Sequence, residues 1–223
     1  MGELDGRVAF ITGASRGIGR AIACRFAAEG AAVVVSASRM GAHGDLEGTL
    51  QDTVANIESA GGKAAAVACD LSDTEARVDL IARASEHFGA VDILVNNAAR
   101  GDYELPSMNS TASRNRVFDL NVNVPIELLQ QALPGMRKKG AGWCLNISSR
   151  TAEQPEPPYP DSKIAAHVIG AYGATKAALN RYTQALADEL AEENIFVNAM
   201  APSNIVLTNV GEAVEAIARR RPD

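Results

Sequence analysis

Short apolar runs alternate along the chain with longer segments in which apolar residues recur at helical spacing. The short runs are rich in alanine and β-branched residues, and they are apolar throughout rather than at every second position. Such continuous runs are typical of strands that are covered on both faces, as in parallel sheets. We therefore predict six buried strands, at residues 7–12, 32–37, 64–69, 91–96, 143–148 and 195–200.

The longer segments between these runs predict helices, and several of them end at a glycine that suits a helix C-cap. Strict alternation of strand and helix predicts an α/β fold with a doubly wound parallel sheet. The 223 residues are enough for one domain with a sizeable core and too few for two, so we expect residues 1–223 to form a single domain. The predicted helices span residues 17–29, 48–60, 74–88, 111–138 and 172–192.

One compositional break interrupts this pattern. Residues 153–163, EQPEPPYPDSK, contain four prolines and can be neither a helix nor a central strand. We interpret residues 150–170 as a loop inserted after the fifth strand, and we do not regard it as a domain boundary.

Charge and composition exclude several classes of function. A net charge of −6 argues against nucleic acid or an anionic membrane surface as the main partner. The N-terminus has no signal-peptide pattern and no apolar run approaches bilayer length, so we expect a cytoplasmic protein. The three cysteines are far apart and no zinc-binding motif occurs, so we expect no metal site.

A glycine-rich turn follows the first predicted strand and opens the first predicted helix. Gly13, Gly17 and Gly19 are spaced GxxxGxG within ITGASRGIGRAIA. Glycines allow a tight turn and leave no Cβ where the backbone meets a pyrophosphate, while the helix N-terminus offers free N–H groups. We predict dinucleotide binding by this turn, through Gly13, Ser15, Arg16, Gly17, Ile18 and Gly19; the alternative is a tight strand-to-helix turn that binds no ligand.

The end of the second strand indicates which dinucleotide is preferred. A carboxylate there would bind the adenosine 2′-hydroxyl and repel a 2′-phosphate, but Ala37 and Ser38 are uncharged. Arg16 and Arg39 could neutralise a 2′-phosphate. We therefore predict NADP(H) in preference to NAD(H), with Ser38 and Arg39 at the site; the alternative is that both arginines simply face solvent.

Two tyrosines each precede a lysine by four residues, Tyr159 with Lys163 and Tyr172 with Lys176. On a helix such a pair shares one face and can act as an acid/base couple. Tyr159 stands before Pro160, which disfavours the helical conformation. Tyr172 instead begins an alanine- and leucine-rich helical segment. We therefore expect Tyr172 and Lys176 to be the functional pair.

These motifs, taken together, resemble a known family. Five of them stand in one order along the chain: TGASRGIG (Thr12–Gly19), NNAA (Asn96–Ala99), the Asn121 of DLNVNV, NISS (Asn146–Ser149) and YGATK (Tyr172–Lys176). In this combination the chain resembles the short-chain dehydrogenase/reductase family, from the N-terminus to about Pro202. The resemblance implies a Rossmann-type sheet and an enzyme that uses NAD(P) to interconvert alcohols and carbonyls.

The resemblance also implies roles for individual residues. Tyr172 would exchange a proton with the substrate oxygen, and Lys176 would lower the pKa of this phenol, which is ordinarily about 10. Ser149 would hydrogen-bond the substrate oxygen, with Ser148 as the alternative one residue away. Asn121 would hold a water that links Lys176 to solvent. Further cofactor contacts are expected from Asp70, Leu71, Asn97, Ala98, Tyr172, Lys176, Pro202, Ile205 and Thr208; Asp70 could equally be a turn or N-cap aspartate.

The chain departs from the family pattern at Ala99 and Ser203, which stand where the family has glycine, and in its tail. The family continues past the sixth strand to a seventh, whereas residues 204–223 provide for one helix. Either the last strand is lacking or the chain continues beyond residue 223.

The resemblance implies a homo-oligomer, a dimer or a tetramer, acting on a small-molecule carbonyl or alcohol. The alternative function is a cofactor-binding protein with little turnover, acting in redox sensing or as a scaffold.

Overall fold

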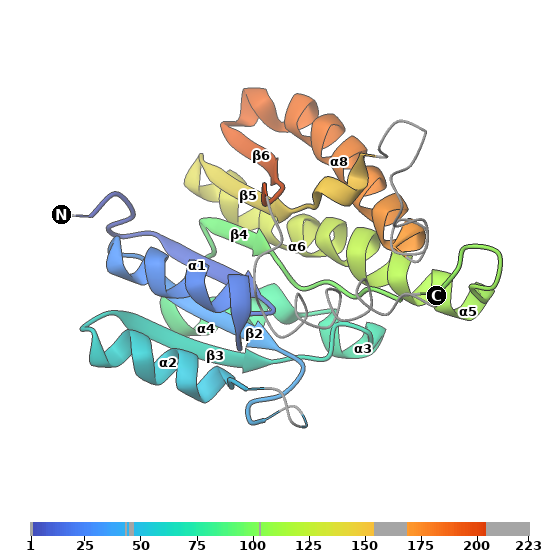
Figure 1. Cartoon of the computed structure of the whole chain (residues 1–223). Helices are drawn as coiled ribbons and strands as arrows, with labels where there is room; N and C mark the ends of the chain where they lie inside the picture. Colours follow the sequence, from blue (N-terminus) through green and yellow to red (C-terminus); the bar gives the residue numbers. More distant parts are fainter. Residues whose placement is uncertain (1, 43, 45–46, 103, 154–168, 204–223) are drawn as a thin grey trace.

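Six strands form one parallel sheet in the order β3-β2-β1-β4-β5-β6, and the computed structural model has helices on both of its faces (Figure 1). The predicted doubly wound α/β fold is therefore confirmed. The structure describes residues 2–42, 44, 47–102, 104–153 and 169–203. The strands are β1 (Val8–Thr12), β2 (Ala32–Ala37), β3 (Lys63–Ala68), β4 (Ile93–Asn96), β5 (Gly142–Ile147) and β6 (Ile195–Met200).

The helices follow the strands in the predicted alternation. Gly30, Gly61 and Gly89, which end three of the predicted helical segments, all have positive φ, as expected of residues that close a helix. No helix in the described part of the chain is long and apolar enough to cross a membrane. The helices are α1 (Gly17–Ala28), α2 (Leu50–Ser59), α3 (Thr74–Arg77), α4 (Leu80–Phe88), α5 (Thr111–Phe118), α6 (Val124–Lys139) and α8 (Gly170–Leu190).

Two of the predicted helices are divided in the structure. The segment 74–88 breaks at Val78 and Asp79 into α3 and α4. The segment 111–138 contains a π-helical turn, Asp119–Asn123, between α5 and α6. A π-turn adds one residue to a helix without ending it, so a pattern of apolar positions does not reveal it.

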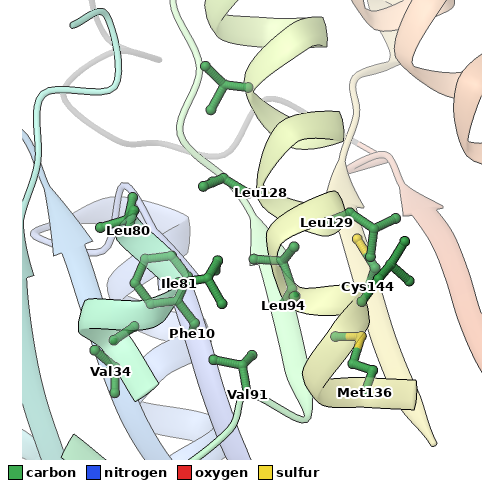
Figure 2. Close-up of a cluster of buried hydrophobic side chains, with 14 of the residues drawn as sticks. Phe10, Val34, Leu80, Ile81, Val91, Leu94, Leu128, Leu129, Met136 and Cys144 are labelled. Atoms are coloured by element: carbon green, nitrogen blue, oxygen red, sulfur yellow. The ribbon is translucent and has the colours of Figure 1, made fainter. Parts of the chain in front are cut away.

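The sheet has a separate apolar layer on each face. Alternate residues of β1 point to opposite faces, with Phe10 on one and Ile11 on the other. The Phe10 layer packs against α4 and α6, and Leu80, Leu128 and Met136 are among the fully buried members that Figure 2 shows. The Ile11 layer packs against α1 and α2. Burial on both faces explains why β1, β2 and β4 are continuously apolar. The prediction is wrong for β6, the last strand of the sheet, where Phe196 and Met200 are exposed.

The sheet has a topological switch point between β1 and β4. From β1 the chain adds β2 and β3 on one side, and it then returns to add β4, β5 and β6 on the other. In open parallel sheets, ligands bind beyond the carboxyl ends of the strands at this point. The segments that follow β1, β4 and β5 therefore meet at one edge of the sheet, and all five family motifs lie on these segments or on the helices beside them.

Candidate active site

The glycine turn after β1 is folded so tightly that two of its positions admit only glycine. Gly13 has a φ of +64°, and a Cβ there would lie 2.9 Å from the Asn97 side-chain nitrogen. A Cβ on Gly19 would lie 2.4 Å from the Gly13 carbonyl oxygen and 2.5 Å from the same nitrogen. Gly13 and Gly19 are thus required by close contact between the turn, α1 and the segment after β4, and Gly17, with a φ of +56°, by its left-handed backbone.

Asn97 joins this turn to the end of β4. Its Nδ2 donates to the carbonyl oxygens of Thr12 and Gly13, at 2.9 and 3.1 Å. In the other direction, the Thr12 hydroxyl accepts from the backbone N–H groups of Asn97 and Ala98, both at 3.0 Å. The side chain of Asn97 therefore holds the phosphate turn in shape, and this role was not foreseen from the sequence.

The N-terminus of α1 is suited to hold an anion. The helix starts at Gly17, and its N-cap residue Arg16 provides no side-chain cap for the first N–H groups. The first turn carries no acidic residue. Uncapped N–H groups at the positive end of a helix are an anion site, and the missing Cβ atoms leave room for a pyrophosphate. The residues present thus fit the phosphates of a dinucleotide.

Two arginines lie near this helix end. Arg16 is half-buried, and its Nη1 is fully buried without a hydrogen-bond partner among the described residues. The loop before α2 packs over it, since a Cβ on Gly48 would lie 3.2 Å from the Arg16 Cβ. Ser38 and Arg39 follow β2 and are both exposed. An unpartnered buried guanidinium nitrogen is costly unless an anion pairs with it.

The segment after β3 favours the structural interpretation of Asp70. Its Oδ1 accepts from the Ser72 backbone N–H at 3.0 Å and from the Ser72 hydroxyl at 2.7 Å, which closes an Asx-turn. Leu71 is buried in the α4 and α6 layer. Asp70 is therefore a turn aspartate, and its contact with adenine stays a prediction.

Tyr172 and Lys176 lie one turn apart in the first half of α8 and face each other. The Lys176 Nζ is 5.6 Å from the centroid of the Tyr172 ring, within the range of a cation–π contact. The same Nζ donates to the Ile147 carbonyl oxygen at 2.7 Å, at the end of β5. Lys176 is only 2% exposed. This burial lowers the pKa of its ammonium to about 8.

The turn that follows Ser149 packs against α8 next to Tyr172, through a contact at Gly173. Ser149 caps a short 3₁₀ turn, Arg150–Ala152, and its hydroxyl oxygen accepts from the Thr151 N–H at 3.2 Å. The turn packs on α8 so closely that a Cβ on Gly173 would lie 2.4 Å from the Thr151 carbonyl oxygen. Thr151, two residues after the half-buried Ser149, therefore lies against the residue that follows Tyr172. Ser148, by contrast, is buried, and its hydroxyl has no partner among the described residues.

Asn121 lies in the π-helical turn and is fully buried. Its Nδ2 donates to the Arg100 carbonyl oxygen at 2.8 Å and to the Thr175 hydroxyl at 3.0 Å. The Thr175 hydroxyl donates in turn to the Tyr172 carbonyl oxygen at 2.7 Å. Both amide hydrogens of Asn121 are therefore used to join the segment after β4 to α8. Thr175 was not singled out from the sequence, because a threonine inside a helix has no distinctive pattern.

The remaining predicted residues lie after β6 or in the inserted loop. Pro202 is half-buried just after β6, and Arg150 donates through Nη1 to the neighbouring Ser203 carbonyl oxygen at 2.9 Å. Within the described residues, no three His, Cys, Asp or Glu side chains gather as a possible metal site. Ile205, Thr208, Tyr159 and Lys163 lie outside the described residues.

Comparison with known proteins agrees with this geometry. The short chain dehydrogenase family profile matches residues 7–217. The chain is 36% identical over 208 residues to 7alpha-hydroxysteroid dehydrogenase of Escherichia coli K12, covering 92% of this chain and 73% of that protein. It is 37% identical over 205 residues to glucose 1-dehydrogenase 2 of Bacillus subtilis, covering 91% and 73%.

Solved structures with the same fold include complexes with either nicotinamide cofactor. A metagenomic short-chain oxidoreductase in complex with NADP superposes with a TM-score of 0.79 at 31% identity, covering 98% of this chain and 92% of that one. A 7alpha-hydroxysteroid dehydrogenase complexed with NADH and 7-oxo glycochenodeoxycholic acid has a TM-score of 0.82 at 36% identity, covering 94% and 75%. The chain therefore belongs to the family of NAD(P)-dependent short-chain dehydrogenases.

Proposed function

We propose that the chain is an NADP(H)-dependent oxidoreductase that interconverts a carbonyl and a secondary alcohol, with Tyr172 as the acid/base. One observation carries the proposal. The amine of Lys176 is buried, fixed on the Ile147 carbonyl oxygen and directed at the Tyr172 ring, beside the turn that presents Ser149. Burial of a charged lysine is costly, and such perturbed groups cluster at functional sites, where the charge acts on a neighbouring group.

Residues at the switch point would hold the cofactor. The uncapped N-terminus of α1 and the turn from Gly13 to Gly19 suit the pyrophosphate. Arg16 and Arg39 suit a 2′-phosphate, because no carboxylate occupies positions 37–39 and the Arg16 Nη1 lacks a partner among the described residues. The related structures include one protein with NADP and another with NADH, so the preference for NADP(H) rests on these arginines.

The chemistry divides among three side chains. The bound nicotinamide supplies or accepts the hydride. Tyr172 would give a proton to the substrate oxygen during reduction and take it back during oxidation. The Lys176 ammonium would stabilise negative charge on the phenol oxygen. Ser149 would donate a hydrogen bond to the substrate oxygen and hold it in line with Tyr172. The Ser149 hydroxyl oxygen accepts from the Thr151 N–H and hydroxyl, so with respect to the described residues its own hydrogen is available for the substrate.

The surroundings of the site complete the proposal. Residues 1–223 would act as one domain, with the insertion at 150–170 lining the substrate site, because specificity in such folds is carried by loops. The protein would act in the cytoplasm as a homodimer or homotetramer on a small-molecule carbonyl or alcohol. Neither nucleic acid nor a membrane would be a partner, given the net charge of −6.

A parallel assay with NADPH and NADH tests the function. NADPH binding is followed by its fluorescence, and turnover by its oxidation with a panel of ketones. We expect Tyr172→Phe to lower turnover by about 100-fold or more without loss of NADPH binding. Tyr182→Phe, at an exposed position of the same helix, is the control, and Tyr159→Phe should keep at least about a tenth of the activity.

Two results would contradict the proposal. If NADPH binds but no ketone or secondary alcohol is turned over, the chain is a cofactor-binding protein and Tyr172 has no acid/base role. If Tyr159→Phe abolishes turnover while Tyr172→Phe does not, the acid/base residue is misassigned.

A further inference from the structure

Arg77, the last residue of α3, is a charged side chain that the proposed chemistry does not use. It is only 3% exposed, yet all five of its N–H groups have acceptors. Nε and Nη2 donate to the two Glu127 oxygens at 2.7 and 3.2 Å. Nη1 and Nη2 donate to the two Asp119 oxygens at 2.8 and 3.1 Å. Nη1 also donates to the Leu71 carbonyl oxygen at 2.7 Å.

One of the two carboxylates begins the π-helical turn and the other follows it. Asp119 is its first residue and Glu127 lies in the first turn of α6. In an unbroken α-helix, residues eight apart point about 80° away from each other. A π-turn inserts one residue, so the two stand like residues seven apart, about 20° from each other. The π-turn therefore brings both carboxylates to the side of the helix that one guanidinium can reach.

The same turn positions Asn121, two residues after Asp119. Its amide reaches away from Arg77 to the Arg100 backbone and to Thr175, which is bound to the Tyr172 carbonyl oxygen. Loss of the inserted residue would rotate Asn121 by about 100° relative to α6. Such a rotation would break its bond to Thr175. A continuous set of contacts thus runs from Arg77 through the π-turn to the first turn of α8.

We propose that Arg77 is a positioning residue: its grip on Asp119 and Glu127 selects the π-turn and so holds Asn121 against the helix that carries Tyr172 and Lys176. The inference rests on the proposed function for its effect on turnover. Its effect on the conformation of the turn is independent of that function. The bidentate pairing with Arg77 lowers the pKa of the Asp119 carboxyl, which agrees with a strong contact.

Arginine is needed here because its planar fork spans two carboxylates and a carbonyl at once. A lysine offers three N–H groups from a single atom and cannot reproduce this geometry. The bond to the Leu71 carbonyl also ties the turn to the segment after β3, where adenine is expected.

The test compares Arg77→Lys and Arg77→Met with the same two substitutions at Arg83, the partly exposed arginine of α4 that pairs with Asp79. Turnover is measured with NADPH and a ketone found for the wild-type protein. Hydrogen exchange of the backbone amides of residues 119–124 is measured in the same proteins. We expect both Arg77 variants to lose about tenfold to a hundredfold in kcat. KM for NADPH should change little, and amide exchange should accelerate at residues 119–124 but not in β1 or β4.

Glu127→Gln provides a variant for the case that an Arg77 variant does not fold. It removes one charge from a residue that is itself partly exposed and should produce the same pattern, in weaker form. The proposal is overturned if the Arg77 variants match the Arg83 variants in kcat and in exchange. It is also overturned if exchange rises uniformly through the sheet, or if kcat falls while residues 119–124 stay protected. A wild-type protein without turnover would refute the proposed function, whereas the exchange measurement would still decide the role of Arg77.

Discussion

The buried ammonium of Lys176 predicts an unusual pH dependence of stability. Burial lowers its pKa from 10.5 to about 8 in the folded protein. This lowering of the pKa corresponds to a loss of about 3 kcal/mol in the stability of the folded protein, as long as the lysine is charged in both the folded and the unfolded chain. Below about pH 8 the full penalty applies. Between about pH 8 and pH 10.5 the unfolded chain binds the proton that the folded protein has released, so the penalty disappears as pH rises.

The assay measures the free energy of unfolding by urea, without cofactor, for the wild-type protein and for Lys176→Met. Methionine has a similar length and no charge, so the difference between the two proteins isolates the titration of Lys176. Between pH 7 and pH 9, the free energy of unfolding of the wild type should rise by about 1 kcal/mol relative to that of Lys176→Met. Other groups titrate equally in both proteins and cancel in the comparison.

Lys138 provides the matched control, because it is exposed at the end of α6. The difference between the wild type and Lys138→Met should not depend on pH over the same interval. If the stability of the wild type relative to Lys176→Met stays constant, or falls as pH rises, Lys176 is not held as a desolvated ammonium. The argument that it acts on Tyr172 from a water-poor position would then fail.

Two further predictions concern the cofactor site. Gly19→Ala places a Cβ 2.4 Å from the Gly13 carbonyl oxygen, so it should cost about 1–3 kcal/mol of stability and weaken NADPH binding. The control is Gly41→Ala, where the nearest atom to a new Cβ is 4.0 Å away. Equal thermal unfolding midpoints for the two variants would refute the close contact between Gly19 and Gly13. Arg39→Asp should lower the affinity for NADPH about tenfold to a hundredfold, because charged hydrogen bonds contribute about 1.5–3 kcal/mol. It should lower the affinity for NADH much less. An equal loss for both cofactors would show that Arg39 does not contact the 2′-phosphate.

Local chemistry made several parts of the protein predictable. The strands at 32–37 and 195–200 agree with the structure to the residue, because a short apolar run that follows a helix is typical of a strand in a parallel sheet. The glycine turn was predictable because only glycine tolerates the backbone angles and contacts at Gly13. The choice of Tyr172 over Tyr159 as a helical residue rested on Pro160, and Tyr172 does lie on a helix facing Lys176; its catalytic role stays a prediction.

The sequence by itself therefore determined the order and type of the strands and helices. It also determined the glycines that the backbone angles of the turn after β1 require. The tertiary structure alone decided which of these residues meet. Gly173 had no visible role until the turn after Ser149 was found packed against it. Arg77 looked like any other helical arginine until two carboxylates from distant positions enclosed it. The reason is physical: strand and helix patterns report neighbours within a few residues. A π-turn, a buried amine and an ion cluster depend instead on contacts between residues 29 to 50 positions apart in the chain.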